Sequence, residues 1–163
     1  MVTSAPCAIR KATPDDADAI LECLREAFEP FRRAYTPGAF ADTVLTPDTI
    51  ARRFETMTIL VAATRDNTIA GTIAAGVTTP HEGHLRGMAV RALWQGRGIA
   101  EQLLASAEWL LRSRGCRCIT LDTTEPLARA IAFYRKHGYS PTGRVQDFYG
   151  MSLHQFAKDI AAP

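Results

Sequence analysis

The segment Gln95–Ala100 has the residue types of an anion-binding turn. It reads Gln-Gly-Arg-Gly-Ile-Ala and stands directly before a long segment with helical periodicity. Glycines at such a place let backbone N–H groups approach an anion closely, and the positive end of the helix dipole favours the negative charge. The alternative interpretation is a turn from strand to helix in which the glycines serve only the backbone conformation and bind no anion. The spacing matches neither the Gly-x-Gly-x-x-Gly pattern of dinucleotide sites nor the phosphate-binding loop, whose Lys and Ser or Thr are absent.

Polar side chains recur along the strand predicted over residues 83–90. His84, Arg86 and Met88 share one parity, so they are expected on one face, and Glu82 lies one step further out. His84 can take up a proton near neutral pH, directly or through water, and Glu82 is the acidic alternative. Alternatively, each is an exposed polar residue at a strand end with no chemical role.

An arginine inside a sheet needs an anionic partner. For Arg86 the sequence offers Asp122, at the end of the strand that follows. The alternative is a carboxylate or phosphate of a ligand, bound by Arg86 together with Arg32, Arg33 and Tyr35. Both interpretations stay open.

Tyr134 stands in a segment with helical spacing. Ala130, Phe133, Tyr134 and His137 fall at i, i+3, i+4 and i+7. Spacing alone therefore favours an aromatic stripe that packs on a core over a chemical role.

Alternating strands and helices are expected to position these residues. The periodic segments predict strands at 8–11, 58–64, 69–77, 83–90, 118–123 and 151–158, and helices at 14–28, 47–54, 99–111 and 127–137. Residues 31–45 show no period and carry Phe31, Arg32 and Tyr35, which predicts an irregular segment, either a binding loop or a tolerated one. The element order predicts a three-layer α/β fold, with helices on both faces of a mixed, mostly antiparallel sheet.

The chain of 163 residues predicts a single domain over 1–163, and its 47% hydrophobic and 22% charged residues are typical of a globular protein. The net charge of +2 is scattered, which disfavours a nucleic-acid-binding domain. Neither an export signal nor a membrane-spanning run is evident, so we expect a cytoplasmic protein without a membrane partner. A homodimer is left open.

No metal is expected. Cys116 and Cys118 could form half of a site, but the sequence supplies no second pair, so buried free thiols are favoured. His81 and His84 lack a third ligand.

Four segments resemble, in order, those of the GCN5-related N-acetyltransferase (GNAT) family. They are Ile9–Thr13 with acidic residues after it, Met88–Val90, Gln95–Ala100, and Ala130–Tyr134 with His137–Tyr139. Gln95–Ala100 matches the family motif Gln/Arg-x-x-Gly-x-Gly/Ala. Four segments at the family's spacings argue against a chance match.

The resemblance implies an acetyl-CoA site. In the family the turn holds the pyrophosphate, which would fall here to Gln95, Gly96, Arg97, Gly98, Ile99 and Ala100. The preceding strand pairs with the pantetheine arm, which would involve the main chain of Met88, Ala89 and Val90. A backbone N–H near Val90 would polarise the thioester carbonyl. Arg91 and Arg97 would be available as counter-charges to the pyrophosphate.

The resemblance also implies a chemical role for Tyr134. The family's tyrosine at this place lies beside the CoA sulfur and can protonate the departing thiolate, for which a phenol with a pKa near ~10 is suited. One departure from the family is Leu127, which stands where many members have Asn. The CoA hydrogen bond of that Asn is then either missing or supplied by Thr123 or Thr124.

The implied activity is acetyl transfer from acetyl-CoA to a primary amine by direct attack. We expect a small-molecule acceptor that carries an acidic group, bound by Phe31, Arg32, Tyr35, Arg86 and Asp122, because arginines would repel a polycation such as spermidine or an aminoglycoside. The alternative is a catalytically inactive acyl-CoA-binding sensor or regulatory module.

Overall fold

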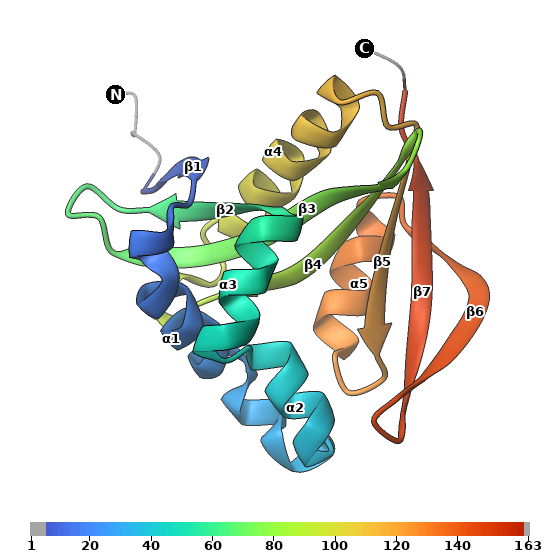
Figure 1. The fold of residues 1–163 in the computed structure, drawn as a ribbon, viewed down its shortest axis with the longest axis horizontal. Coiled ribbons are helices and arrows are strands. Elements are labelled where there is room, and N and C mark those ends of the chain that lie inside the picture. The colour runs from blue at the N-terminus through green and yellow to red at the C-terminus, as the bar shows by residue number, and fades with distance from the viewer. Residues whose placement is uncertain (1–5, 162–163) are drawn as a thin grey trace.

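Seven strands form one mixed sheet in the computed structural model, which describes residues 6–161 (Figure 1). Their order across the sheet is β1-β2-β3-β4-β5-β7-β6, and only the neighbours β4 and β5 are parallel. The strands are β1 (Ala8–Lys11), β2 (Thr58–Ala63), β3 (Ile69–Thr79), β4 (Glu82–Val90), β5 (Cys118–Thr124), β6 (Ser140–Phe148) and β7 (Met151–Asp159). The predicted mixed, mostly antiparallel sheet is confirmed.

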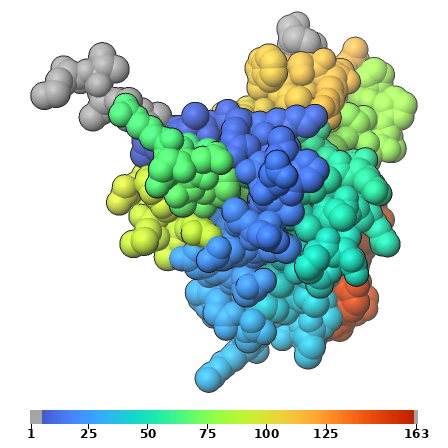
Figure 2. Space-filling view, turned by 60° about the vertical axis from the view of Figure 1, so that its left-hand side comes forward, coloured from blue at the N-terminus to red at the C-terminus, as the bar shows by residue number. Residues whose placement is uncertain are grey.

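Helices cover both faces of this sheet. They are α1 (Ala17–Phe28), α2 (Pro37–Val44), α3 (Pro47–Thr56), α4 (Ile99–Ser113) and α5 (Ala128–Lys136), with short 3-10 turns at Pro14–Asp16, Glu29–Ala34 and Ala92–Trp94. Apolar residues of α4 and α5 form one core with the sheet. A second core lies under α1, α2 and α3, which cover the face shown in blue to teal in Figure 2.

Local signals start the N-terminal helices where the sequence predicts them. Thr46 accepts a hydrogen bond from the Thr49 N–H, which caps α3. Before α1, the Thr13 N–H donates to the Asp16 carboxylate at 2.9 Å, and Arg10 pairs with the same carboxylate at 2.8 Å. The first helix is thereby tied to strand β1.

Two elements were not predicted. Residues 31–45, expected to be irregular, are largely helical, because Thr36 caps α2 by accepting from the Ala39 N–H and Pro37 occupies its first position. Strand β6 was missed because almost all of its residues are exposed, so it has no apolar alternation. It is an edge strand paired only with β7.

The sheet opens between its two parallel strands. Residues 82–85 of β4 pair with residues 118–121 of β5, and among residues 6–161 no strand pairs with β4 on that side beyond Leu85. The main chain of residues 86–90 therefore has free hydrogen-bonding groups at this opening. No helix within the described residues is long and apolar enough to cross a membrane.

Candidate active site

A cleft of about 520 Å³ lies where β4 and β5 separate. Its walls come from α1 and α2, from β4 and the turn before α4, and from β5 and α5. The turn and α5 line one half, and residues of α2 and α3 line the other. The cleft therefore has walls from elements on both faces of the sheet.

The turn before α4 presents unpaired backbone donors. Gly96 and Gly98 have φ values of +76° and +81°, and a Cβ at either would meet nothing within 4 Å. Within residues 6–161, the N–H groups of residues 96–101 have no hydrogen-bond acceptor. The Gln95 side chain donates to the Val90 carbonyl at 3.0 Å and closes the turn. This cradle at the helix N-terminus suits a pyrophosphate.

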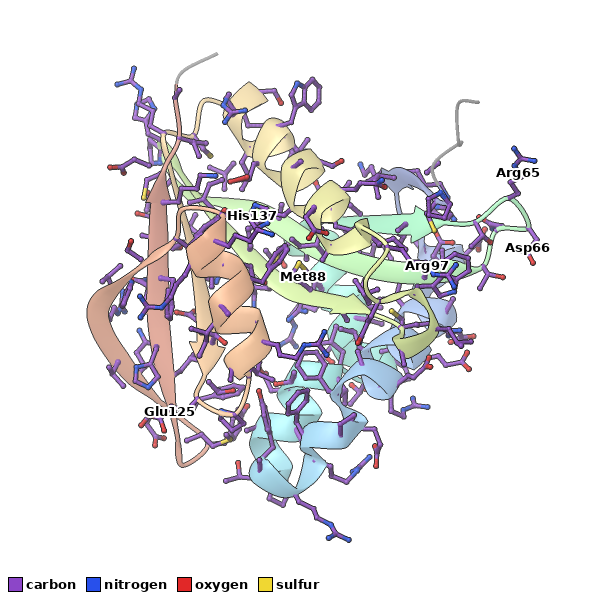
Figure 3. All side chains as sticks on the ribbon, turned by 180° about the vertical axis from the view of Figure 1, so that it is seen from behind. Arg65, Asp66, Met88, Arg97, Glu125 and His137 are labelled. Carbon is purple, nitrogen blue, oxygen red and sulfur yellow. The ribbon has the colours of Figure 1, made fainter. Side chains whose placement is uncertain are left out.

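A β-bulge reorders the side chains of β4. Thr72 of β3 pairs with Ala89, but Ala74 pairs with Arg86, so β4 holds one extra residue at Gly87, whose φ is +60°. Met88 consequently packs on the α4 and α5 core, which Figure 3 shows from behind. The expectation that His84 and Arg86 share a face with Met88 is wrong, because the bulge changes the parity between them.

Tyr134 lines the cleft from α5 and is only 8% exposed. Its ring makes edge-on contacts with Phe133 and Tyr139, with centroids 5.5 and 5.7 Å away. Burial raises the pKa of the Tyr134 phenol, so the hydroxyl keeps its proton at neutral pH. It can serve as a proton donor but not as a base.

The two threonines at the end of β5 differ in their hydrogen bonds. The Thr124 hydroxyl lies 2.6 Å from the Tyr35 hydroxyl and is thereby occupied. The Thr123 hydroxyl lines the cleft and is buried without a partner among residues 6–161. A buried hydroxyl of this kind favours a ligand that hydrogen-bonds it, which leaves Thr123 as the free donor beside Leu127.

His84 faces the other half of the cleft. Its Nδ1 lies 2.7 Å from the Thr120 hydroxyl, and its Nε2 lies 3.5 Å from the Asp122 carboxylate. Burial lowers the pKa of His84, while the Asp122 charge opposes this effect. The imidazole is therefore neutral at pH 7 and able to accept a proton.

Arg86 does not pair with Asp122. Its Nη2 lies 3.5 Å from the Asp42 carboxylate of α2, and its side chain is half-exposed in the cleft. Asp122 instead lies beside His84. The pairing that the sequence offered for Arg86 is thus wrong, because Arg86 contacts Asp42 of α2, an element the sequence did not predict.

Arg53 of α3 also lines this half, and sequence analysis missed it. It is 9% exposed, and the structure gives its guanidinium no ion pair or side-chain hydrogen bond within residues 6–161. Burial and the neighbouring Arg86 lower the pKa of Arg53 to about 10, so it remains charged at neutral pH. The available signal was its place on the apolar side of the helix, three residues after Ile50 and four before Met57.

Residues 18–139 match the family model of the acetyltransferase (GNAT) family. This chain belongs to the GNAT family. It is 32% identical over 153 residues to the aminoglycoside N(6')-acetyltransferase type 1 of Stenotrophomonas maltophilia, a match that covers 91% of this chain and 95% of that protein.

Solved structures show the same fold. The PaiA N-acetyltransferase of Thermoplasma acidophilum in complex with coenzyme A superposes with a TM-score of 0.77 at 18% identity, covering 94% of this chain and 99% of that one. The ribosomal-protein-S18-alanine N-acetyltransferase of Escherichia coli gives a TM-score of 0.76 at 20% identity, with 96% of each chain covered. The expected GNAT fold is confirmed.

Family membership makes the protein an acetyl-CoA-dependent N-acetyltransferase, as expected, and favours an enzyme over an inactive sensor. The cleft suits this co-substrate. Its free donors, at residues 96–101 and at Thr123, match the acceptor-rich pyrophosphate and pantetheine. Within the described residues no group of three or more potential ligands could hold a metal ion.

The remaining candidate residues divide by position. Besides His84, Arg86 and Tyr134, the candidate residues that line the cleft are Phe31, Tyr35, Met88, Ala89, Val90, Gln95, Gly96, Gly98, Ile99, Ala100 and Asp122. Arg97 lies outside that lining and stacks on Trp94, with 5.0 Å from its guanidinium to the ring centroid. Figure 3 shows it on the turn before α4.

Three charged residues have partners other than those expected. Arg32 pairs with Glu29 at 2.8 Å and Glu82 accepts from the Thr78 hydroxyl at 3.3 Å, and neither residue lines the cleft. Arg91, expected as a counter-charge, pairs instead with two glutamates of α1, Glu22 and Glu26, at 3.4 and 3.3 Å.

Proposed function

We propose that this GNAT enzyme acetylates the primary amine of a small molecule that carries an acidic group. The observation that carries the proposal is the pair of arginines, Arg53 and Arg86, in the half of the cleft opposite the glycine turn. Cationic side chains there favour an anionic group on the acceptor. Phe31 and Tyr35 add aromatic surface, which suits a small and partly apolar molecule.

Binding of the co-substrate would use main-chain groups. Residues 96–101 would bind the pyrophosphate, and the unpaired edge of β4 at Met88 and Val90 would bind the pantetheine arm. Acetyl-CoA supplies the acetyl group as an activated thioester. A backbone N–H near Val90 would stabilise the negative charge that develops on the carbonyl oxygen.

Two proton transfers would accompany the reaction. His84 would accept a proton from the incoming ammonium, leaving the neutral amine to form the new C–N bond. The Asp122 carboxylate, 3.5 Å from Nε2, would stabilise the resulting imidazolium. As the C–S bond breaks, the Tyr134 hydroxyl would relay the second proton: it would donate its own proton to the thiolate and take up the one that the attacking nitrogen loses as the amide forms.

A second candidate acceptor is an aminoglycoside. The observation that favours it is the 32% identity to an aminoglycoside N(6')-acetyltransferase. The arginines oppose it, because like charges brought together in a cleft cost several kcal/mol.

A panel of amine acceptors separates these proposals. Release of CoA is measured with amino acids, amino acid amides, spermidine and kanamycin, with CoA binding followed by calorimetry as a control. The proposal predicts the highest kcat/KM for an amine with a free acid group. A best activity with kanamycin or spermidine would contradict it.

A further inference from the structure

We propose that the acceptor half of the cleft is a zwitterion site, in which Arg53 binds the acid group of an amino acid-like acceptor and Asp122 with His84 receives its ammonium. This inference rests on the proposed function and deepens it. It names the acceptor class and assigns a specificity-determining role to Arg53, a residue of α3 outside the predicted site.

The first observation is the state of Arg53. Its side chain lines the cleft, is nine-tenths buried, and has no ion pair or side-chain hydrogen bond in the described part of the chain. Burying an unpaired guanidinium destabilises a folded protein unless a partner of opposite charge binds to it. A ligand carboxylate can make two parallel hydrogen bonds with such a group. The cleft thus contains a built anion site that the protein itself leaves unpartnered.

The charges around Arg53 determine the net charge that a bound acid group must carry. Arg86 lies near enough to lower the pKa of Arg53, and Arg86 itself pairs with Asp42 at 3.5 Å. Two guanidinium groups therefore share one carboxylate, and one positive charge is left. A monoanionic carboxylate balances it, whereas a dianionic phosphonate exceeds it.

The cationic end of the site lies close by. The Asp122 carboxylate is 3.5 Å from the His84 imidazole, and burial keeps that imidazole neutral, so this end carries a negative charge. Arg53 and Arg86 line the same cleft as His84 and Asp122, so both ends lie in one compartment. Opposite charges at this short range match a molecule with its amine and acid only a few bonds apart.

The test uses binding of acetylated products, which needs no turnover. N-acetyl derivatives of the twenty amino acids and the corresponding N-acetyl amides are titrated by calorimetry into the CoA-bound enzyme. We expect at least one acid to bind 10-fold or more tightly than its amide. We expect Arg53→Met to abolish that preference and Arg53→Lys to restore part of it, with the Kd for CoA unchanged in both.

Removing the negative charge of Asp42 provides an independent test of the site. Asp42→Asn leaves two positive charges, so binding of 2-acetamidoethylphosphonate should improve relative to N-acetyl-β-alanine by 5-fold or more. Acids and amides that bind equally, an acid preference that survives Arg53→Met, or binding of none of the acids would overturn the zwitterion site.

The two proposals fail in different ways. Turnover of kanamycin without selective binding of any acid would overturn the zwitterion site and leave N-acetyl transfer intact. Acid-selective binding that depends on Arg53, without turnover of any amine, would uphold Arg53 as the acid-binding residue and contradict the proposed roles of Tyr134 and His84.

Discussion

Replacing Gly87 by Ala tests how the bulge of β4 positions Arg53. Gly87 has a φ of +60°, and a Cβ there would lie 2.8 Å from Nη1 of Arg53. A non-glycine residue in the left-handed region costs ~1–2 kcal/mol, of which the lower entropy of the unfolded chain offsets ~0.4–1 kcal/mol. The net loss of unfolding free energy should be ~1 kcal/mol, which lowers the Tm by ~2–4 °C in a chain of this size.

The same substitution should also weaken acceptor binding. The guanidinium is the movable end of the contact, so it must shift away from the new methyl group. Loss of a charge-assisted hydrogen bond is worth ~1.5–3 kcal/mol, which corresponds to a ~10- to 100-fold higher acceptor KM. The Kd for CoA should not change, because the guanidinium lies in the acceptor half.

Gly143→Ala is the matched control. Gly143 has a φ of +90° on the exposed strand β6, and a Cβ there meets nothing within 4 Å. Both variants should lose similar stability in thermal unfolding, but only Gly87→Ala should raise the acceptor KM in steady-state kinetics. Equal acceptor KM values in the two variants would refute the argument that Gly87 keeps space for Arg53. A Gly87→Ala protein as stable as its parent would refute the strain argument.

Three further predictions concern the chemistry of the cleft. Gly98→Val should weaken CoA binding strongly in calorimetry while the fold is kept, since the side chain would fill the open cradle, and parental affinity would show the cradle is misplaced. Tyr134→Phe should lower kcat by ~10²- to 10⁴-fold with little change in CoA affinity, and an unchanged kcat under chemistry-limited conditions would reduce Tyr134 to packing. Burial lowers the pKa of His84, so the neutral base is present at pH 7 and is lost as the pH falls below 6.5. The pH profile of kcat/KM should therefore have an acidic limb that disappears in His84→Gln, and a limb that persists would assign it to another group.

Much of the fold could be predicted because its signals are local. Apolar residues at helical spacing locate α1, α4 and α5, and Thr-Pro pairs mark the start of α1 and α3. A third Thr-Pro pair, at Thr36, starts α2 and was overlooked among aromatic and cationic neighbours. Strand β6 could not be found from periodicity, because an edge strand exposed on both faces needs only its partner β7.

The candidate site divides in the same way. The glycine turn at residues 95–100 and the helical face of Tyr134 follow from local spacing, because both are set by residues a few positions apart. Their roles toward acetyl-CoA were implied by the family resemblance and stay predictions. The charged acceptor half of the cleft could not be predicted in this way. The ion pair of Arg86 depends on where α2 packs, and the bulge at Gly87 moves Met88 to the opposite face from Arg86.

Arg53 shows the limit of the sequence most clearly. In the sequence it is one of two adjacent arginines on a short helix, and only its helical spacing from Ile50 and Met57 sets it apart from Arg52. Only the packing of α3 on the sheet buries one and exposes the other. The sequence by itself determined the glycine turn before α4 and the helices α1, α3, α4 and α5, since backbone conformation depends on near neighbours. The tertiary structure decided which charges meet in the acceptor half, since those distances depend on strand register and on helices far apart in the chain.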